Sequence, residues 1–102
     1  MNLFVYGTLV DDALVVQLTG RRFPRRAARL QGYRKHVPAG SYPFVVPDED
    51  GMVEGVVLEG IDADALRAFD AYEDEGQLYR RVEVTITVAG LPQRAFVYVA
   101  AR

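Results

Sequence analysis

The chain has 102 residues, half of them hydrophobic, and a formal net charge of -2. This length predicts one domain over residues 1–102, and the absence of cysteine excludes disulfides, thiolate nucleophiles and zinc–thiolate sites. No apolar stretch is long enough for a membrane span and no signal-peptide pattern is present, so we expect a cytoplasmic protein without membrane contact.

Charge is distributed unevenly along the chain. Residues 21–36 carry six arginines and one lysine without an acid, whereas residues 48–75 carry eleven acids and one base. An arginine-rich stretch can bind nucleic acid, but such domains are usually basic overall and offer a groove-entering or base-stacking element. Neither is evident here. We expect no nucleic-acid binding, and a solvated face whose arginines pair in part with the acidic half.

The first predicted element is a buried strand over residues 2–5, which runs directly into the tetrapeptide Tyr6-Gly7-Thr8-Leu9. Glycine allows a sharp turn where the strand ends. If residues 11–19 then form a helix, backbone N–H groups converge near its N-terminus, where a carboxylate or phosphate can bind. The alternative is an ordinary strand-to-helix connection that Thr8 caps.

The middle of the chain predicts further strands. Residues 27–37 read as a strand in which Gly32 indicates a bulge or a close backbone approach. Residues 44–46 and 52–58 flank the acidic stretch 47–51, which has the composition of an exposed turn. We therefore expect these two segments to pair with each other as a hairpin.

The last third of the chain has the clearest periodicity. Residues 62–73 predict a helix that Asp62 caps, residues 79–88 alternate between apolar and polar, and residues 93–100 form a final strand. Together the elements predict an α+β fold: a small, mixed, mostly antiparallel β-barrel flanked by two helices. A terminal edge strand could pair with a second chain, but no apolar seam favours this, so we expect a monomer or a weak dimer.

One carboxylate falls on an apolar helix face. At 100° per residue, Glu73 lies within about 20° of Leu66, inside the stripe that also carries Phe69. Burial there would raise the pKa of Glu73 and make it a proton shuttle near neutral pH, so Glu73 is the candidate catalytic group. The alternative is that burial fades at the helix end and Glu73 pairs with Arg80 or Arg81.

Two further sites are considered. Asp70 lies at the edge of the same stripe and is expected to accept a hydrogen bond or to form a salt bridge. The single histidine, His36, would need carboxylates alone as co-ligands, so we expect no metal site.

Five segments, in order along the chain, resemble the γ-glutamylcyclotransferase-like family, most closely its short AIG2-like branch. They are Tyr6-Gly7-Thr8-Leu9, Gly40-Ser41-Tyr42-Pro43, Asp70-Ala71-Tyr72-Glu73, Tyr79-Arg80-Arg81-Val82-Glu83-Val84 and Val97-Tyr98-Val99. The resemblance implies a small β-barrel with a pocket at its mouth, and a cyclisation that releases 5-oxoproline from a small γ-glutamyl substrate without a cofactor.

The resemblance also implies residue roles. The family's loop, whose backbone N–H groups hold the γ-glutamyl moiety, matches Tyr6, Gly7, Thr8 and Leu9, and its catalytic glutamate matches Glu73. Tyr79 and Tyr98 are candidate pocket walls, although aromatic residues on strands more often belong to the core. A non-catalytic domain that binds a metabolite or a protein on the same fold is the alternative function.

The chain departs from the family pattern at two places. Val10-Asp11-Asp12 follows the tetrapeptide, where branches that act on γ-glutamylamines commonly have a lysine and a glycine-containing run. Asp74 and Glu75 separate Glu73 from the next glycine and add negative charge beside the expected pocket. We therefore expect acidic substrates such as glutathione to be disfavoured.

Overall fold

The computed structural model describes residues 1–101, and its five strands close into a barrel in the order β1-β3-β2-β4-β5. All neighbouring strands pair antiparallel except β1 and β5, which are parallel. This mixed, mostly antiparallel barrel confirms the predicted fold class. The strands are β1 (Leu3–Val5), β2 (Arg25–His36), β3 (Phe44–Leu58), β4 (Tyr79–Val88) and β5 (Leu91–Ala100).

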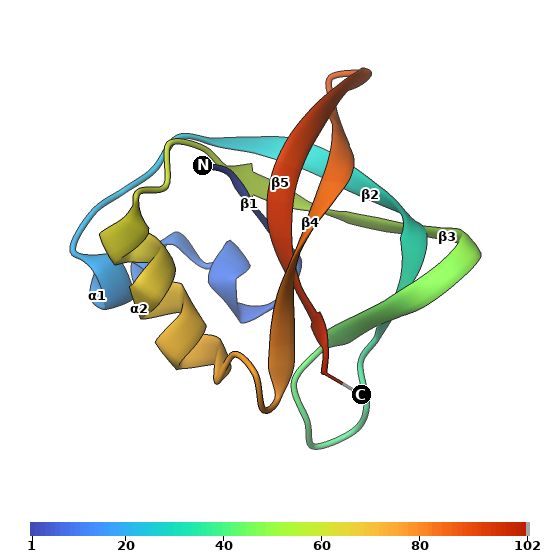
Figure 1. The fold of residues 1–102 in the computed structure, drawn as a ribbon, viewed down its shortest axis with the longest axis horizontal. Coiled ribbons are helices and arrows are strands. Elements are labelled where there is room, and N and C mark those ends of the chain that lie inside the picture. The colour runs from blue at the N-terminus through green and yellow to red at the C-terminus, as the bar shows by residue number, and fades with distance from the viewer. Residues whose placement is uncertain (102) are drawn as a thin grey trace.

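Strand β1 is buried on both faces. The Phe4 side chain belongs to the core inside the barrel, whereas Leu3 and Val5 belong to a second core between the barrel and the helices. Side chains alternate along a strand, so three consecutive apolar residues are what two cores on opposite faces require. The helical core is completed by Leu66 and Phe69, and both helices lie on one side of the barrel beside β1 (Figure 1).

Two α-helices and one short 3-10 helix complete the fold. The 3-10 helix η1 (Thr8–Val10) begins within the tetrapeptide. Helices α1 (Asp12–Thr19) and α2 (Ala63–Glu73) each have an aspartate as N-cap. The predicted Asp62 cap is confirmed, because its carboxylate accepts the Ala65 N–H at 2.9 Å. Among residues 1–101, neither helix is long and apolar enough to cross a membrane.

The predicted hairpin of residues 44–46 with 52–58 is wrong. Both segments belong to the continuous strand β3, and both pair with β2 rather than with each other. The acidic stretch 47–51 lies where β3 bends, opposite a register shift between Gln31 and Tyr33 (Figure 1). The bulge predicted at Gly32 is thereby confirmed, and its positive φ of 86° suits glycine.

The arginine-rich stretch forms a salt-bridged surface, as its charge pattern predicts. Its arginines pair with acids of α1 and of the acidic half of the chain. The pairs are Arg21–Asp62, Arg22–Asp12, Arg25–Asp12, Arg26–Glu59, Arg29–Glu54 and Arg34–Asp48. The terminal edge strand considered for dimerisation is absent from the described residues, because β1 and β5 are each paired on both sides.

At Gly55 the backbone of β3 lies close against β1. A Cβ at this position would lie 2.3 Å from the Val5 carbonyl oxygen and 2.8 Å from the Phe4 ring. Backbone cannot yield as a flexible side chain can, so we predict that Gly55→Ala lowers the free energy of unfolding by about 3 kcal/mol in urea titrations.

Gly60→Ala is the matched control. Gly60 has a positive φ of 73° but open space around its Cβ position, so alanine there costs only about 1 kcal/mol of backbone strain. Equal losses of stability in the two variants would contradict the close approach at Gly55.

Candidate functional site

The tetrapeptide turns the chain from β1 into η1 at the mouth of the barrel. The first N–H groups of a short helix lack intrahelical partners, and no acceptor within residues 1–101 pairs with those of Gly7, Thr8 and Leu9. Thr8 is not the cap of α1, contrary to the alternative considered above. Asp11 caps that helix through the Ala13 N–H at 3.0 Å, whereas the Thr8 hydroxyl accepts the Tyr72 hydroxyl at 2.9 Å.

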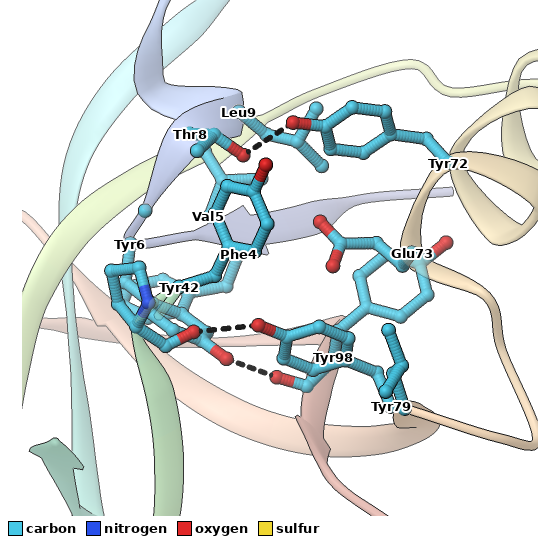
Figure 2. Close-up of a pocket in the computed structure, with 13 residues that line it drawn as sticks. Phe4, Val5, Tyr6, Thr8, Leu9, Tyr42, Tyr72, Glu73, Tyr79 and Tyr98 are labelled. Carbon is cyan, nitrogen blue, oxygen red and sulfur yellow. Dashed lines mark hydrogen bonds between the residues drawn. The ribbon is translucent and has the colours of Figure 1, made fainter. Parts of the chain in front are cut away.

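Glu73 is the last residue of α2 and is half-buried. Its side chain continues the stripe of Leu66 and Phe69, and Figure 2 shows its carboxylate directed from α2 into the space that Thr8, Tyr42 and Tyr79 surround. Burial raises the pKa of Glu73 from an ordinary 4.5 to about 7. The alternative pairing with Arg80 or Arg81 is not found in the described structure, since Arg81 pairs with Asp70.

Glu73 and the tetrapeptide face each other across one cavity of about 120 Å³, which we call the inner pocket. Five tyrosines dominate its lining, and Glu73 is the only acid in it. The complete lining is Phe4, Val5, Tyr6, Gly7, Thr8, Leu9, Tyr42, Pro43, Tyr72, Glu73, Leu78, Tyr79 and Tyr98. No lysine or arginine among residues 1–101 lines it.

Asp70 anchors α2 to the barrel one turn before Glu73. Its carboxylate accepts the Tyr98 hydroxyl at 2.7 Å and pairs with Arg81 of β4. The Tyr98 carbonyl in turn accepts the Tyr6 hydroxyl at 2.6 Å, which joins β5 to the tetrapeptide (Figure 2). Asp70 thus has both the roles expected for it, hydrogen-bond acceptor and salt-bridge partner, and the network fixes the helix end that carries Glu73.

Three of the pocket tyrosines, Tyr6, Tyr79 and Tyr98, have raised pKa values. Burial, followed by the charges of Tyr79 and Glu73, raises the pKa of Tyr6. Burial also raises the pKa of Tyr79, and that of Tyr98 with added contributions from Asp70. These three phenols are therefore hydrogen-bond donors at neutral pH, whereas the Glu73 carboxylate titrates near neutral pH.

The structure brings all seven candidate residues to the inner pocket. Tyr98 belongs to the core, since it is only 3% exposed, and it also lines the pocket. The Tyr79 hydroxyl donates to the Pro43 carbonyl at 2.8 Å. Sequence reasoning assigned no role to Tyr42, Pro43, Tyr72 and Leu78, which also line the pocket. Tyr42, Pro43 and Tyr72 lie inside the segments that resemble the family, so that resemblance was the sequence signal that could have identified them as pocket residues.

The family description "Gamma-glutamyl cyclotransferase, AIG2-like" matches residues 3–102 of the chain. The chain belongs to this family. It is 38% identical over 87 residues to AIG2-like protein C and 38% identical over 86 residues to AIG2-like protein A, both of Arabidopsis thaliana. These matches cover 84% and 83% of the chain, and 51% of each relative, so the chain spans about half the length of the curated relatives it matches.

Solved structures agree with this assignment. A protein of Arabidopsis thaliana solved in solution superposes with a TM-score of 0.88 at 32% identity, covering 99% of this chain and 68% of that one. A structure described as gamma-glutamyl cyclotransferase superposes with a TM-score of 0.81 at 16% identity, covering 100% of this chain and 67% of that one. At that identity the second similarity shows the shared fold alone.

The raised pKa of Glu73 makes stability depend on pH. The folded state holds the Glu73 proton more tightly than the unfolded chain, so this contribution is full below about pH 4.5 and is lost as pH rises through about 7. We predict that Glu73→Gln lies within about 0.5 kcal/mol of the wild type near pH 5, where most of this contribution is still present. At pH 8 the variant is more stable by roughly 1–2 kcal/mol, a figure that allows for water screening a half-buried charge.

Urea unfolding at the two pH values measures this difference. Glu49→Gln on the exposed part of β3 reports the effect of losing one negative charge alone. A Glu73→Gln difference that is the same at pH 5 and pH 8 would contradict the burial of this carboxylate.

The Tyr98 hydroxyl contributes to stability through a charged acceptor. Tyr98→Phe removes the donor to Asp70 and is expected to lower the free energy of unfolding by about 1.5–3 kcal/mol. Tyr33→Phe removes the same atom from a partly buried ring whose hydroxyl has no protein partner in residues 1–101, and should cost less than about 0.5 kcal/mol. Chemical denaturation of both variants checks the prediction, and equal effects would refute it.

Proposed function

We propose that the protein is a γ-glutamyl cyclotransferase that converts a small γ-glutamyl compound, an amino acid or amine conjugate, into 5-oxoproline and the free amine. The observation that carries the proposal is the position of Glu73. A carboxylate without a partner in the described residues, with a pKa near 7, faces a turn with unused N–H groups across one small pocket. Membership of the family supports the same activity.

The proposed reaction is intramolecular. Ionised Glu73 takes a proton from the substrate's α-ammonium group and passes it to solvent, and the free amine nitrogen attacks the γ-carbonyl carbon to close a five-membered ring. Glu73 then takes the second proton from the ring nitrogen and donates it to the leaving nitrogen, as the tetrahedral intermediate breaks its bond to that nitrogen and re-forms the carbonyl. Because the nucleophile and electrophile belong to one molecule, the pocket has only to fold the substrate into attack geometry, and the proposal needs no cofactor.

The tetrapeptide is the proposed substrate cradle. The N–H groups of Gly7, Thr8 and Leu9 can donate to the α-carboxylate or to the developing oxyanion. The hydrogen bond between Tyr72 and Thr8 supports this role, because it ties the cradle to the helix end that carries Glu73. Tyr79 and Tyr98 form the proposed walls: the Tyr79 hydroxyl donates to the Pro43 carbonyl, and the Tyr98 carbonyl accepts the Tyr6 hydroxyl of the cradle.

A screen of γ-glutamyl amino acids, γ-glutamyl amines and glutathione for 5-oxoproline release tests the proposal. Glu73→Gln is expected to lower kcat about 100- to 10,000-fold, the usual contribution of a general acid–base group. The wild-type kcat/KM should rise as pH passes about 7, and this limb should be missing in the variant. Turnover of glutathione should be poor, because Asp74 and Glu75 flank the site.

Glu49→Gln is the control, since it makes the same chemical change on an exposed strand residue and should stay within about twofold of the wild type. Release that is unchanged in Glu73→Gln would refute the mechanism. Saturable binding of a γ-glutamyl compound without release would favour the alternative, a non-catalytic binding domain on the same fold.

A further inference from the structure

Tyr72 connects the last turn of α2 to the tetrapeptide across the inner pocket. Its hydroxyl donates to the Thr8 hydroxyl at 2.9 Å, and both residues line the pocket. Figure 2 shows the Tyr72 ring directed from α2 toward Thr8, with the Glu73 carboxylate below it in that view. We call this contact the Tyr72–Thr8 bridge. It joins α2 to η1 through residues that are 64 positions apart in the sequence.

The bridge lies between the pocket and solvent. Tyr72 is 38% exposed and also lines the inner pocket, so its ring has water on one side and the cavity on the other. Tyr72 directly precedes Glu73 at the end of α2, so the ring and the carboxylate leave the helix from adjacent positions. A ring in this place is suited to cover the carboxylate on the side between α2 and η1.

The opposite side of the pocket is open. Tyr42 and Leu78 line it there, and each is 66% exposed. A hollow of about 450 Å³, which is more open to solvent, adjoins the pocket at these two residues and at Tyr79. The rim of the inner pocket is therefore asymmetric, with a hydrogen-bonded side and an open side.

Water is the factor that decides the protonation of Glu73. Burial is the cause of its raised pKa, about 7 against an ordinary 4.5. The titratable groups that face it across the pocket are phenols: Tyr6, Tyr42, Tyr72, Tyr79 and Tyr98. The charged groups of the adjoining segments do not belong to the pocket lining: Lys35, Asp70, Asp74, Glu75, Arg80 and Arg81. Of these, Asp70 and Arg81 pair with each other, and the Lys35 ammonium donates to the Tyr6 carbonyl at 3.4 Å.

We propose that Tyr72 is a positioning residue for Glu73, because its ring, held by the bridge to Thr8, closes the inner pocket between α2 and η1. The carboxylate is shielded from water on this side, and the pocket opens to solvent past Tyr42 and Leu78. Loss of the bridge hydrates the carboxylate from a second side, and hydration favours the ionised form. The inference rests on the proposed function only for its kinetic consequence, which is that Tyr72 sets the pH range in which Glu73 both accepts and donates a proton.

The titration of Glu73, followed by NMR of its carboxyl carbon in protein without substrate, tests the inference. Glu73→Gln identifies the signal by its loss. Tyr72→Ala removes the ring and the bridge, and should lower the midpoint of the titration by about one pH unit. Tyr72→Phe keeps the ring but releases it from Thr8, and should lower the midpoint by about 0.3–0.5 pH unit.

Matched variants on the open side are the controls. Tyr42→Ala and Tyr42→Phe make the same chemical changes where the pocket already meets water, and should leave the Glu73 midpoint within about 0.2 pH unit of the wild type. Thr8→Val breaks the bridge from its other end. Combined with Tyr72→Phe, it should lower the midpoint no further than either change alone, because a single hydrogen bond is lost.

Chemical denaturation verifies that each variant is folded, and Tyr72→Phe decides the test if Tyr72→Ala does not fold. A midpoint that stays within about 0.2 pH unit of the wild type in the folded Tyr72 variants overturns the inference. An equal lowering by Tyr42→Ala and Tyr72→Ala overturns it as well, and so do additive effects of Thr8→Val and Tyr72→Phe.

Kinetics separate this inference from the function proposed above. In Tyr72→Ala, the rise of kcat/KM with pH should move to lower pH together with the NMR midpoint, and a rise that stays in place while the midpoint moves overturns the kinetic consequence. Failure of the folded wild type to release 5-oxoproline from any γ-glutamyl compound overturns the proposed function alone, because the NMR titration is made without substrate.

Discussion

The burial of β1 on both faces is the constraint on which the rest of the structure depends. This three-residue strand contributes Phe4 to the barrel core and Leu3 and Val5 to the helical core, and its pairing with β3 and β5 closes the barrel. The strand ends at the barrel mouth, where the tetrapeptide turns the chain into η1. The side chains of Tyr6, Thr8 and Leu9 are tied into the structure, whereas the N–H groups of Gly7, Thr8 and Leu9 have no acceptor within residues 1–101.

Glu73 owes its position to a second set of contacts, made by α2. The apolar stripe of Leu66 and Phe69 docks α2 against the barrel. Two hydrogen bonds hold its last turn: the Tyr98 hydroxyl donates to Asp70, and the Tyr72 hydroxyl donates to Thr8. The stripe does not end before Glu73, so the carboxylate loses part of its hydration and its pKa rises. The packing of α2 thus determines both the position of the Glu73 carboxylate and its raised pKa.

Local sequence patterns predict much of the fold and the position of Glu73. Helical periodicity alone places Glu73 among Leu66 and Phe69, and alternation defines β4, because both depend on side-chain direction within one element. The hairpin error around residues 47–51 has a physical reason, since turn-forming residues fit a bend in a long strand as well as a hairpin tip, and the pairing partner is non-local. The hydrogen bond from Tyr6 to the Tyr98 carbonyl spans 92 positions and leaves no local signal.

The concentration of tyrosine around the inner pocket also gives the molecule an optical property. The chain contains six tyrosines and no tryptophan, and Tyr6, Tyr42, Tyr72, Tyr79 and Tyr98 all line that pocket. Near-ultraviolet absorption and emission therefore arise almost entirely from the cavity walls, with Tyr33 as the one distant contributor. Any molecule that enters and displaces water changes the surroundings of most of the chromophores at once, so the protein carries a built-in spectroscopic reporter of its own occupancy.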